Sequence, residues 1–244
     1  MTGDGLRRLG WVAVAVVLLA AGVVFVVRAT GGASDEPQAV KPTTTTTTTT
    51  TAARTGVDDP TPDVATKVVN VVAVDAQGNP AAGYAVEPWS AVDGCFASSV
   101  AVSADIVACS PTASGTDVCW VVPDRVTLLC GDTPWVKSLR RATSTQPVER
   151  VEAYPNSYPW GLELADGTRC RARNGGSWGG RADGYVAYYS CEGRESVVLA
   201  PPDGSGPVDR SRPAWTVPMG DIGNDNPEFP APVRVRVATA YFAA

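Results

Sequence analysis

The residue types that carry most enzyme chemistry are thinly represented in this chain of 244 residues. It has no histidine, whereas Ser-His-Asp and Cys-His systems and many zinc and haem sites need an imidazole. Its three lysines form no Ser-x-x-Lys pair, and no Asp-[Ser/Thr]-Gly sequence indicates an aspartic dyad. We therefore expect no catalytic residues and no enzymatic activity. The alternative is a histidine-independent hydrolase whose paired carboxylates come together only in the fold.

The six cysteines are the next candidates for chemistry, and their number and spacing favour disulfides. No Cys-x-x-Cys sequence is present, which argues against a thioredoxin-like exchange site and against a zinc knuckle. An even number of cysteines in an oxidising compartment predicts that all of them pair. Cys170 and Cys191 bracket one expected hairpin, so we pair them with each other. The remaining four pair among themselves in an order that the sequence leaves open: Cys95, Cys109, Cys119 and Cys130.

Two short segments place arginines on one face of a strand. In residues 169–173, period-two alternation puts Arg169, Arg171 and Arg173 on one face and the cysteine and alanine on the other. In residues 233–237 the same alternation puts Arg234 and Arg236 outward. If the two strands were neighbours, their guanidinium groups would suit an anionic glycan, a phosphate or a carboxylate. The alternative is a solvated outer face that resists edge pairing.

Trp178 is the unusual aromatic residue, because it lies in the glycine-rich stretch of residues 175–180 (GGSWGG). Glycines give a large ring little local cover, so an exposed indole at a hairpin tip could stack on a sugar or on a partner protein. The alternative is that the ring folds back as a lid on the core. The tentative ligand-binding residues are therefore Trp178 and the five arginines of the two strands.

Charge and oxygen-bearing side chains exclude further classes of ligand. The net charge is −5 and only three residues are lysine, which argues against nucleic-acid binding. A basic region nevertheless extends from Lys137 to Arg181, with eight basic residues against four acidic ones. Asp and Asn side chains gather between Asp221 and Glu228 and offer oxygen ligands suitable for calcium. The segment lacks the EF-hand pattern, however, and such clusters usually form turns. We expect neither a metal nor a cofactor.

The N-terminal part predicts how the chain is anchored. Residues 9–27 carry no charge, close to the roughly 20 residues that a helix needs to cross a bilayer. More positive charge precedes this run than follows it, so residues 1–8 are expected in the cytoplasm and residues 9–28 as an uncleaved signal anchor. A cleaved signal peptide is the alternative. Residues 29–62, with nine consecutive threonines at 43–51, predict a disordered stalk.

The rest of the chain reads as an antiparallel β ectodomain held by disulfides. Glycine and proline interrupt it at short intervals, and no window predicts a long helix. A seam near residues 141–147 suggests two small β subdomains, at 63–142 with four cysteines and at 147–244 with Cys170 and Cys191. Strands are expected at 118–122, 126–130, 161–164, 169–173, 185–191, 196–199, 215–217 and 233–242, with two more about a turn at 78–80 within 68–86.

Three stretches carry a family resemblance: residues 117–135 (DVCWVVPDRVTLLCGDTPW), residues 159–191, and WTVPMG with VRVATAYF nearer the end. Their Cys, Trp and Gly positions resemble those of a group of uncharacterised exported or membrane-anchored proteins of mycobacteria and related actinobacteria. The resemblance implies an envelope location and transfers no activity. We expect a single-pass, extracytoplasmic binding or structural module that recognises a cell-wall glycan or an envelope protein.

Overall fold

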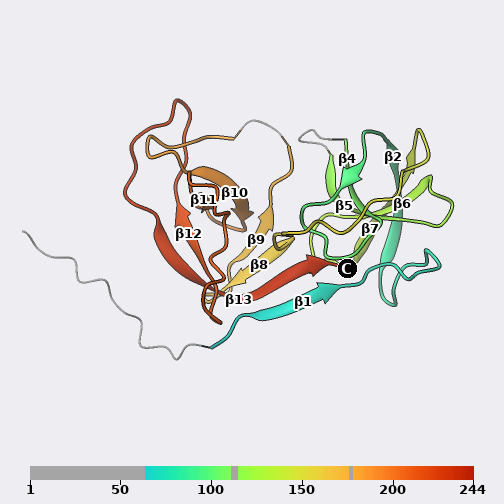
Figure 1. The fold of residues 1–244 in the computed structure, drawn as a ribbon, viewed down its shortest axis with the longest axis horizontal. Helices are drawn as coiled ribbons and strands as arrows, with labels where there is room; N and C mark the ends of the chain where they lie inside the picture. The colour runs from blue at the N-terminus through green and yellow to red at the C-terminus, as the bar shows by residue number, and fades with distance from the viewer. Residues whose placement is uncertain (1–63, 111–114, 176–177) are drawn as a thin grey trace, which may run out of the picture. The chain divides into compact units, whose positions relative to one another are not determined.

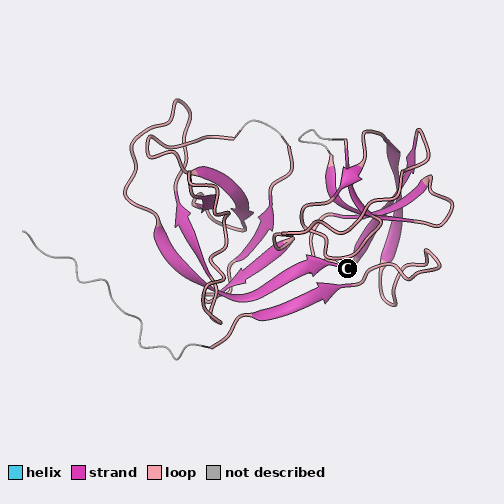
Figure 2. Ribbon diagram, in the orientation of Figure 1, coloured by secondary structure: helices cyan, strands magenta, loops and turns pink. Residues whose placement is uncertain are grey.

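The structure is a computed structural model that describes residues 64–110, 115–175 and 178–244. All regular structure in these ranges is β, as Figure 2 shows. Within them, no helix with the length and apolar character of a membrane span is found. The expected anchor at 9–28 and the expected stalk at 29–62 lie outside the described residues.

The described ranges contain strands β1 to β13, all but β3 labelled in Figure 1, and these strands form two sheets. The strands are β1 (Lys67–Val71), β2 (Ala85–Val92), β3 (Phe96–Ala97), β4 (Ile106–Cys109), β5 (Thr116–Val121), β6 (Thr127–Gly131), β7 (Ser138–Ser144), β8 (Gly161–Leu164), β9 (Arg169–Ala172), β10 (Val186–Cys191), β11 (Val197–Ala200), β12 (Thr216–Gly220) and β13 (Val233–Ala243).

Strands β8 to β13 close into a six-stranded antiparallel barrel. Closure depends on β13, whose residues 233–236 pair with β12 while residues 237–241 pair with β8. Strand β1 is added outside the ring, parallel to β13, with Lys67 opposite Thr239 and Val71 opposite Ala243. Figure 1 shows β1 and β13 running side by side. The expected mostly β fold is confirmed.

The second sheet has the order β2-β7-β6-β5-β4-β3. Its pairs are antiparallel except β2 and β7, which run parallel. Two disulfides lie here, Cys95–Cys109 and Cys119–Cys130, and the second joins directly opposed residues of β5 and β6. The predicted pair Cys170–Cys191 is confirmed and joins β9 to β10 in the barrel. Closing its loop of 21 residues contributes about 3 kcal/mol.

Alternation along β5 and β6 gives the second sheet two buried faces. Cys119 and Cys130 pack in one cluster, whereas Trp120 and Leu129 belong to a core shared with the barrel. In that shared core the Trp120 ring meets the Trp160 ring edge to face, with centroids 6.0 Å apart. Gly131 is required beside them, because an added Cβ would lie 2.9 Å from a Trp160 ring carbon. The two sheets therefore share one apolar core.

Local turn patterns locate both expected turns, but only one of them joins the two strands of a hairpin. The β5–β6 turn is at Pro123–Arg125, where the Asp124 carboxylate accepts hydrogen bonds from the backbone N–H groups of Val126 and Thr127. The expected turn near residues 78–80 is also present, because the Asp75 carboxylate accepts from the N–H groups of Gln77 and Asn79. The strands on its two sides do not pair with each other. Strand β1 joins the barrel and β2 joins the second sheet.

A buried arginine fastens the loop that follows β12. Arg181 is 3% exposed, and its Nη1 donates to the Asp221 carbonyl at 3.0 Å while its Nη2 donates to the Pro230 carbonyl at 2.7 Å. The Asp183 carboxylate accepts from Nε and Nη2 at 3.0 and 2.7 Å, and this bonding raises the pKa of Arg181. The polar segment between Asp221 and Glu228 is thus held by a guanidinium group.

We expect Arg181→Gln to lower the free energy of unfolding by about 2–4 kcal/mol, because the buried guanidinium group and its hydrogen bonds to Asp183 and to the Asp221 and Pro230 carbonyls are lost. Urea denaturation followed by tryptophan fluorescence measures the change. Arg194→Gln is the matched control. It removes an exposed ion pair with Asp166 and should cost less than about 1 kcal/mol. Equal losses for the two variants would contradict this role of Arg181.

Candidate ligand-binding groove

Arg169 and Arg171 of β9, and Arg173 directly after it, project outward, opposite the buried Cys170 and Ala172, as the alternation predicted. Each has a different neighbour. The Arg169 guanidinium lies 5.6 Å from the Trp135 ring centroid, and the Arg173 guanidinium lies 4.8 Å from the Trp178 centroid. Arg171 acts electrostatically on Asp117. The first two arginines are therefore occupied by aromatic rings of the chain itself.

The arginines of β13 lie elsewhere on the barrel. Arg169 is opposite Glu163 on β8, and Glu163 is opposite Thr239 on β13. Arg236 and Arg234 precede Thr239 by three and five residues, so they lie roughly 10–17 Å along β13, with two strand spacings of about 5 Å added. The structure does not bring the five arginines into one cluster. Ligand binding by any of them stays a prediction.

Arg234 and Trp178 already have partners within the chain. Arg234 Nη1 lies 3.0 Å from Asp209 Oδ2 and also donates to the Thr216 hydroxyl at 3.2 Å. The Trp178 ring is half-buried, and it packs against Ala187, Val197 and Leu199 on the outside of the barrel. Its Nε1 donates to the Gly175 carbonyl at 2.7 Å. Trp178 thus takes the position of a lid on this cluster, the alternative that the sequence left open.

A different surface has the form of a binding site. It is a groove of about 870 Å³, within the range of small-molecule sites. Its base is formed by Val68 and Asn70 of β1 with Phe242 of β13, and Asn70 and Phe242 are direct partners in the parallel ladder. One wall is the segment 153–158 that precedes β8, and the other is formed by parts of the segment 204–215 between β11 and β12. Backbone pairing therefore fixes the base while two loops shape the walls.

Arg210 connects the two walls of this groove. Its Nη2 donates to the Ser157 carbonyl on the opposite wall at 2.8 Å. Its guanidinium lies 4.8 Å from the Trp215 ring centroid and 5.4 Å from that of Phe242. None of the ion pairs found in the described part of the chain includes Arg210. Partial burial lowers the pKa of Arg210, but a guanidinium remains charged at neutral pH. The groove therefore holds an uncompensated positive charge.

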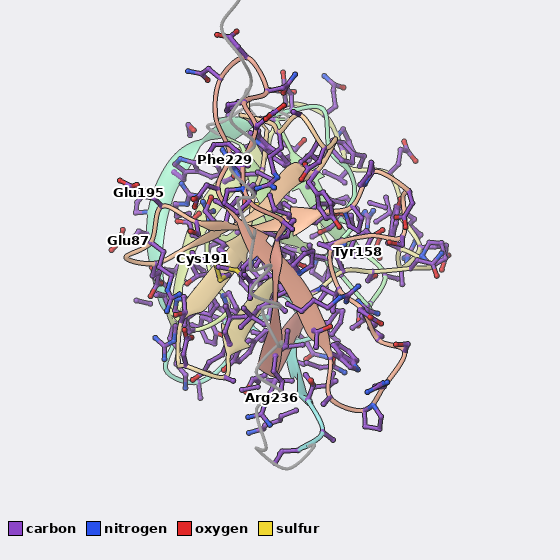
Figure 3. The ribbon with its side chains drawn as sticks, turned by 90° about the vertical axis from the view of Figure 1, so that its left-hand side faces the viewer. Glu87, Tyr158, Cys191, Glu195, Phe229 and Arg236 are labelled. Atoms are coloured by element: carbon purple, nitrogen blue, oxygen red, sulfur yellow. A yellow bond between two sulfur atoms is a disulfide. The ribbon has the colours of Figure 1, made fainter. Side chains whose placement is uncertain are left out.

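Tyrosines line and support the groove wall formed by residues 153–158. Tyr154 is 43% exposed and lines the groove together with Tyr158. The Tyr158 ring packs edge to face on Tyr188, with centroids 5.2 Å apart. Burial raises the pKa of Tyr188 and of Tyr189, so both stay neutral, and the Tyr189 hydroxyl donates to the Pro159 carbonyl at 2.8 Å. Figure 3 shows Tyr158 well apart from Arg236 of β13.

Sequence reasoning missed Arg210. It follows the Gly- and Pro-containing stretch 204–207, where no strand alternation assigns a face. Ser157, which accepts its hydrogen bond, lies 53 positions away. The available signal was weak: an arginine close to a tryptophan in a loop. Only the barrel places it beside Phe242 and the 153–158 wall.

One carboxyl group has an unusual pKa. Asp117 on β5 is mostly buried, and no hydrogen bond to its carboxylate is found among the described residues. Burial raises its pKa to about 6, although the charge of Arg171 acts in the opposite direction. The charge of Asp117 in turn contributes to the raised pKa of Tyr188, and Tyr188 packs against Tyr158 in the groove wall at residues 153–158. Asp117 therefore titrates near the groove without lining it.

We expect Asp117→Asn to stabilise the protein at pH 7 by about 3 kcal/mol. Between about pH 4 and 6 the folded state keeps a proton that the unfolded chain loses, because the pKa rises from 3.8 to about 6 on folding, so at pH 7 the folded protein carries a poorly solvated charge. Stability due to this group is present below about pH 4 and is lost as pH rises through about 6. Urea denaturation between pH 4 and 7 measures this loss, which the asparagine variant should lack.

Asp166→Asn provides the control of opposite sign. Hydrogen bonds from Thr168 lower the pKa of Asp166, so its contribution is present above the unfolded pKa and is lost on acidification. The asparagine variant of Asp166 should therefore be less stable than the unmodified chain at pH 7. A pH profile unchanged by Asp117→Asn would contradict the assignment of the titration near pH 6 to Asp117.

Searches with the sequence and the structure find no matching family model, no matching curated protein and no matching solved structure. The function proposed below therefore rests on the groove itself: Arg210, the rings of Tyr154, Tyr158 and Trp215, and the amide groups of Asn70 and Asn156.

Proposed function

We propose that this chain is an extracytoplasmic binding module of a bacterial cell envelope and that the groove binds an anionic glycan. The observation that carries the proposal is Arg210, a positive charge with no acidic partner among the described residues, placed between aromatic walls. A carboxylate on a sugar ring would supply the missing negative charge and accept parallel hydrogen bonds from the guanidinium.

The remaining lining favours a saccharide over a simple ion. Tyr154, Tyr158 and Trp215 offer ring faces and edges, and aromatic surface with a few placed polar groups is typical of small-molecule sites. Asn70 and Asn156 also line the groove and can donate and accept hydrogen bonds. Sugar hydroxyls need such groups, whereas a bare phosphate would leave most of this surface unused.

The envelope location rests on the N-terminal sequence. The uncharged run at 9–27, the threonine-rich segment after it and the disulfides support a single-pass protein whose β part is extracytoplasmic. The resemblance to exported proteins of mycobacteria and related actinobacteria points to the same compartment. An envelope protein remains the other candidate partner, with the membrane as anchor and no role for nucleic acid.

The alternative of a carboxylate-dependent hydrolase finds no support in this groove. None of the residues that line it is aspartate or glutamate, whereas glycoside hydrolysis requires two carboxyl groups on opposite sides of the scissile bond. Asp117 has the raised pKa of a general acid but does not line the groove. A groove with a fixed cation and no carboxylate is better suited to holding an anion than to cleaving a glycosidic bond.

We expect the full chain to bind oligogalacturonate more tightly than a neutral oligosaccharide of equal length. Arg210→Gln should weaken the acidic ligand at least about tenfold, because a charge-assisted hydrogen bond is worth about 1.5–3 kcal/mol. Arg210→Lys keeps the charge and loses the planar fork, so its affinity for the acidic ligand should lie between those of the unmodified chain and of Arg210→Gln. Isothermal titration calorimetry measures all three dissociation constants.

Arg169→Gln and Arg171→Gln are the matched controls, because they remove cations that do not line the groove. Both should leave the affinity unchanged. An affinity that falls with these variants and not with Arg210→Gln would move the site to the β9 arginines. No binding at all, or equal binding of the neutral oligosaccharide, would refute the proposal.

A further inference from the structure

One side of strand β1 has backbone groups without partners. The Ala244 N–H donates to the Val71 carbonyl, so the odd-numbered residues of β1 face β13. The even-numbered residues therefore direct their N–H and C=O groups away from the barrel. Thr66 obeys this rule, because its N–H donates to the Pro213 carbonyl of a neighbouring loop. Beyond it, no backbone partner of Val68, Asn70 or Val72 is found on this side within the described residues.

Two of the three side chains along this edge are exposed and apolar. Val68 is 51% exposed and Val72 is 58% exposed, and they flank Asn70. Strand edges in soluble proteins usually carry charged residues or proline, or are covered. This edge has Lys67, but the alternation of side chains places it on the face opposite to the two valines. An exposed edge of this kind is a template for another strand.

We propose that two copies of this chain pair antiparallel along their β1 edges about a two-fold axis at Asn70. The sequence Val68-Val69-Asn70-Val71-Val72 is a palindrome, so Val68 of one copy meets Val72 of the other, and Asn70 meets its own counterpart. All three are hydrogen-bonded pairs in this register, so the two edges exchange about six backbone hydrogen bonds. A second copy would therefore bury the apolar side chains and supply hydrogen-bond partners for the backbone groups along this edge.

The charges near the edge agree with this register. With Asn70 on the axis, Lys67 of one copy lies opposite Ala73 of the other, and the two lysines lie about 20 Å apart. The pairing is thus free of direct charge repulsion, which is the usual obstacle for edge strands that carry lysine. The contact is short, so we expect weak association that becomes visible at high concentration.

The dimer goes beyond the proposed glycan binding and holds or fails independently of it. It would nevertheless affect the groove, because Val68 and Asn70 also form part of the groove base. Pairing at β1 places the grooves of two copies next to each other across the axis. A polymeric ligand could then engage both, with the gain in avidity that two linked sites provide.

Charge exchange at the two valines tests the register. Val68→Lys with Val72→Glu places lysine opposite glutamate in both symmetric pairs, so association should persist. Val68→Lys with Val72→Lys places lysine opposite lysine twice and should lower the association constant at least about tenfold. Sedimentation velocity of the full chain in mild detergent, over a range of protein concentration, gives the association constants.

A zero-length carbodiimide cross-linker adds a positional readout. When Val68→Lys is combined with Val72→Glu, the two substituted positions of one chain are about 13 Å apart, too far for such a bond. A cross-link between positions 68 and 72 in a covalent dimer therefore identifies pairing between copies. Val136→Lys with Val233→Lys is the matched control, because it adds positive charge at exposed valines elsewhere and should change nothing. A monomer at all concentrations, or equal association of the two combinations at residues 68 and 72, would overturn the proposal.

Discussion

The pairing of β13 with three other strands is the constraint on which the rest of the described structure depends. One run of eleven residues binds β12 along its first part, β8 along its middle and β1 along its end. It therefore closes the barrel and carries the added strand at the same time. Its last residues also pair with residues near Ala101, which lead into the second sheet. Strand β13 therefore fixes the positions of the barrel, of β1 and of the segment that leads into the second sheet.

The groove inherits its geometry from this arrangement. Phe242 comes from β13, Val68 and Asn70 come from β1, and the loop that ends at β12 presents Trp215 and Arg210 above them. The regular strands hold the base rigidly, while the polar and aromatic groups come from loops. This division is common in binding proteins, where a stable scaffold supports variable recognition segments. The absence of an acidic side chain from the lining leaves Arg210 as the dominant charge.

The sequence predicted features that depend on neighbours in the chain. The hairpin between β5 and β6, the turn at residues 75–79 and the Cys170–Cys191 pair all follow from local turn residues and alternation. It did not predict the parallel pairs β1–β13 and β2–β7, because parallel partners are distant in sequence and leave no turn between them. Arg210 was not predicted for a related reason. Its partners Ser157 and Phe242 reach it only through the barrel.

The parallel contact between β1 and β13 also determines the order in which the chain can fold. The two strands are separated by more than 160 residues of sequence, so their pairing is among the least local contacts possible in a domain of this size. Loop-closure entropy makes such contacts slow to form. During synthesis, the barrel therefore stays open until residues 233–243, almost the last of the chain, have left the ribosome.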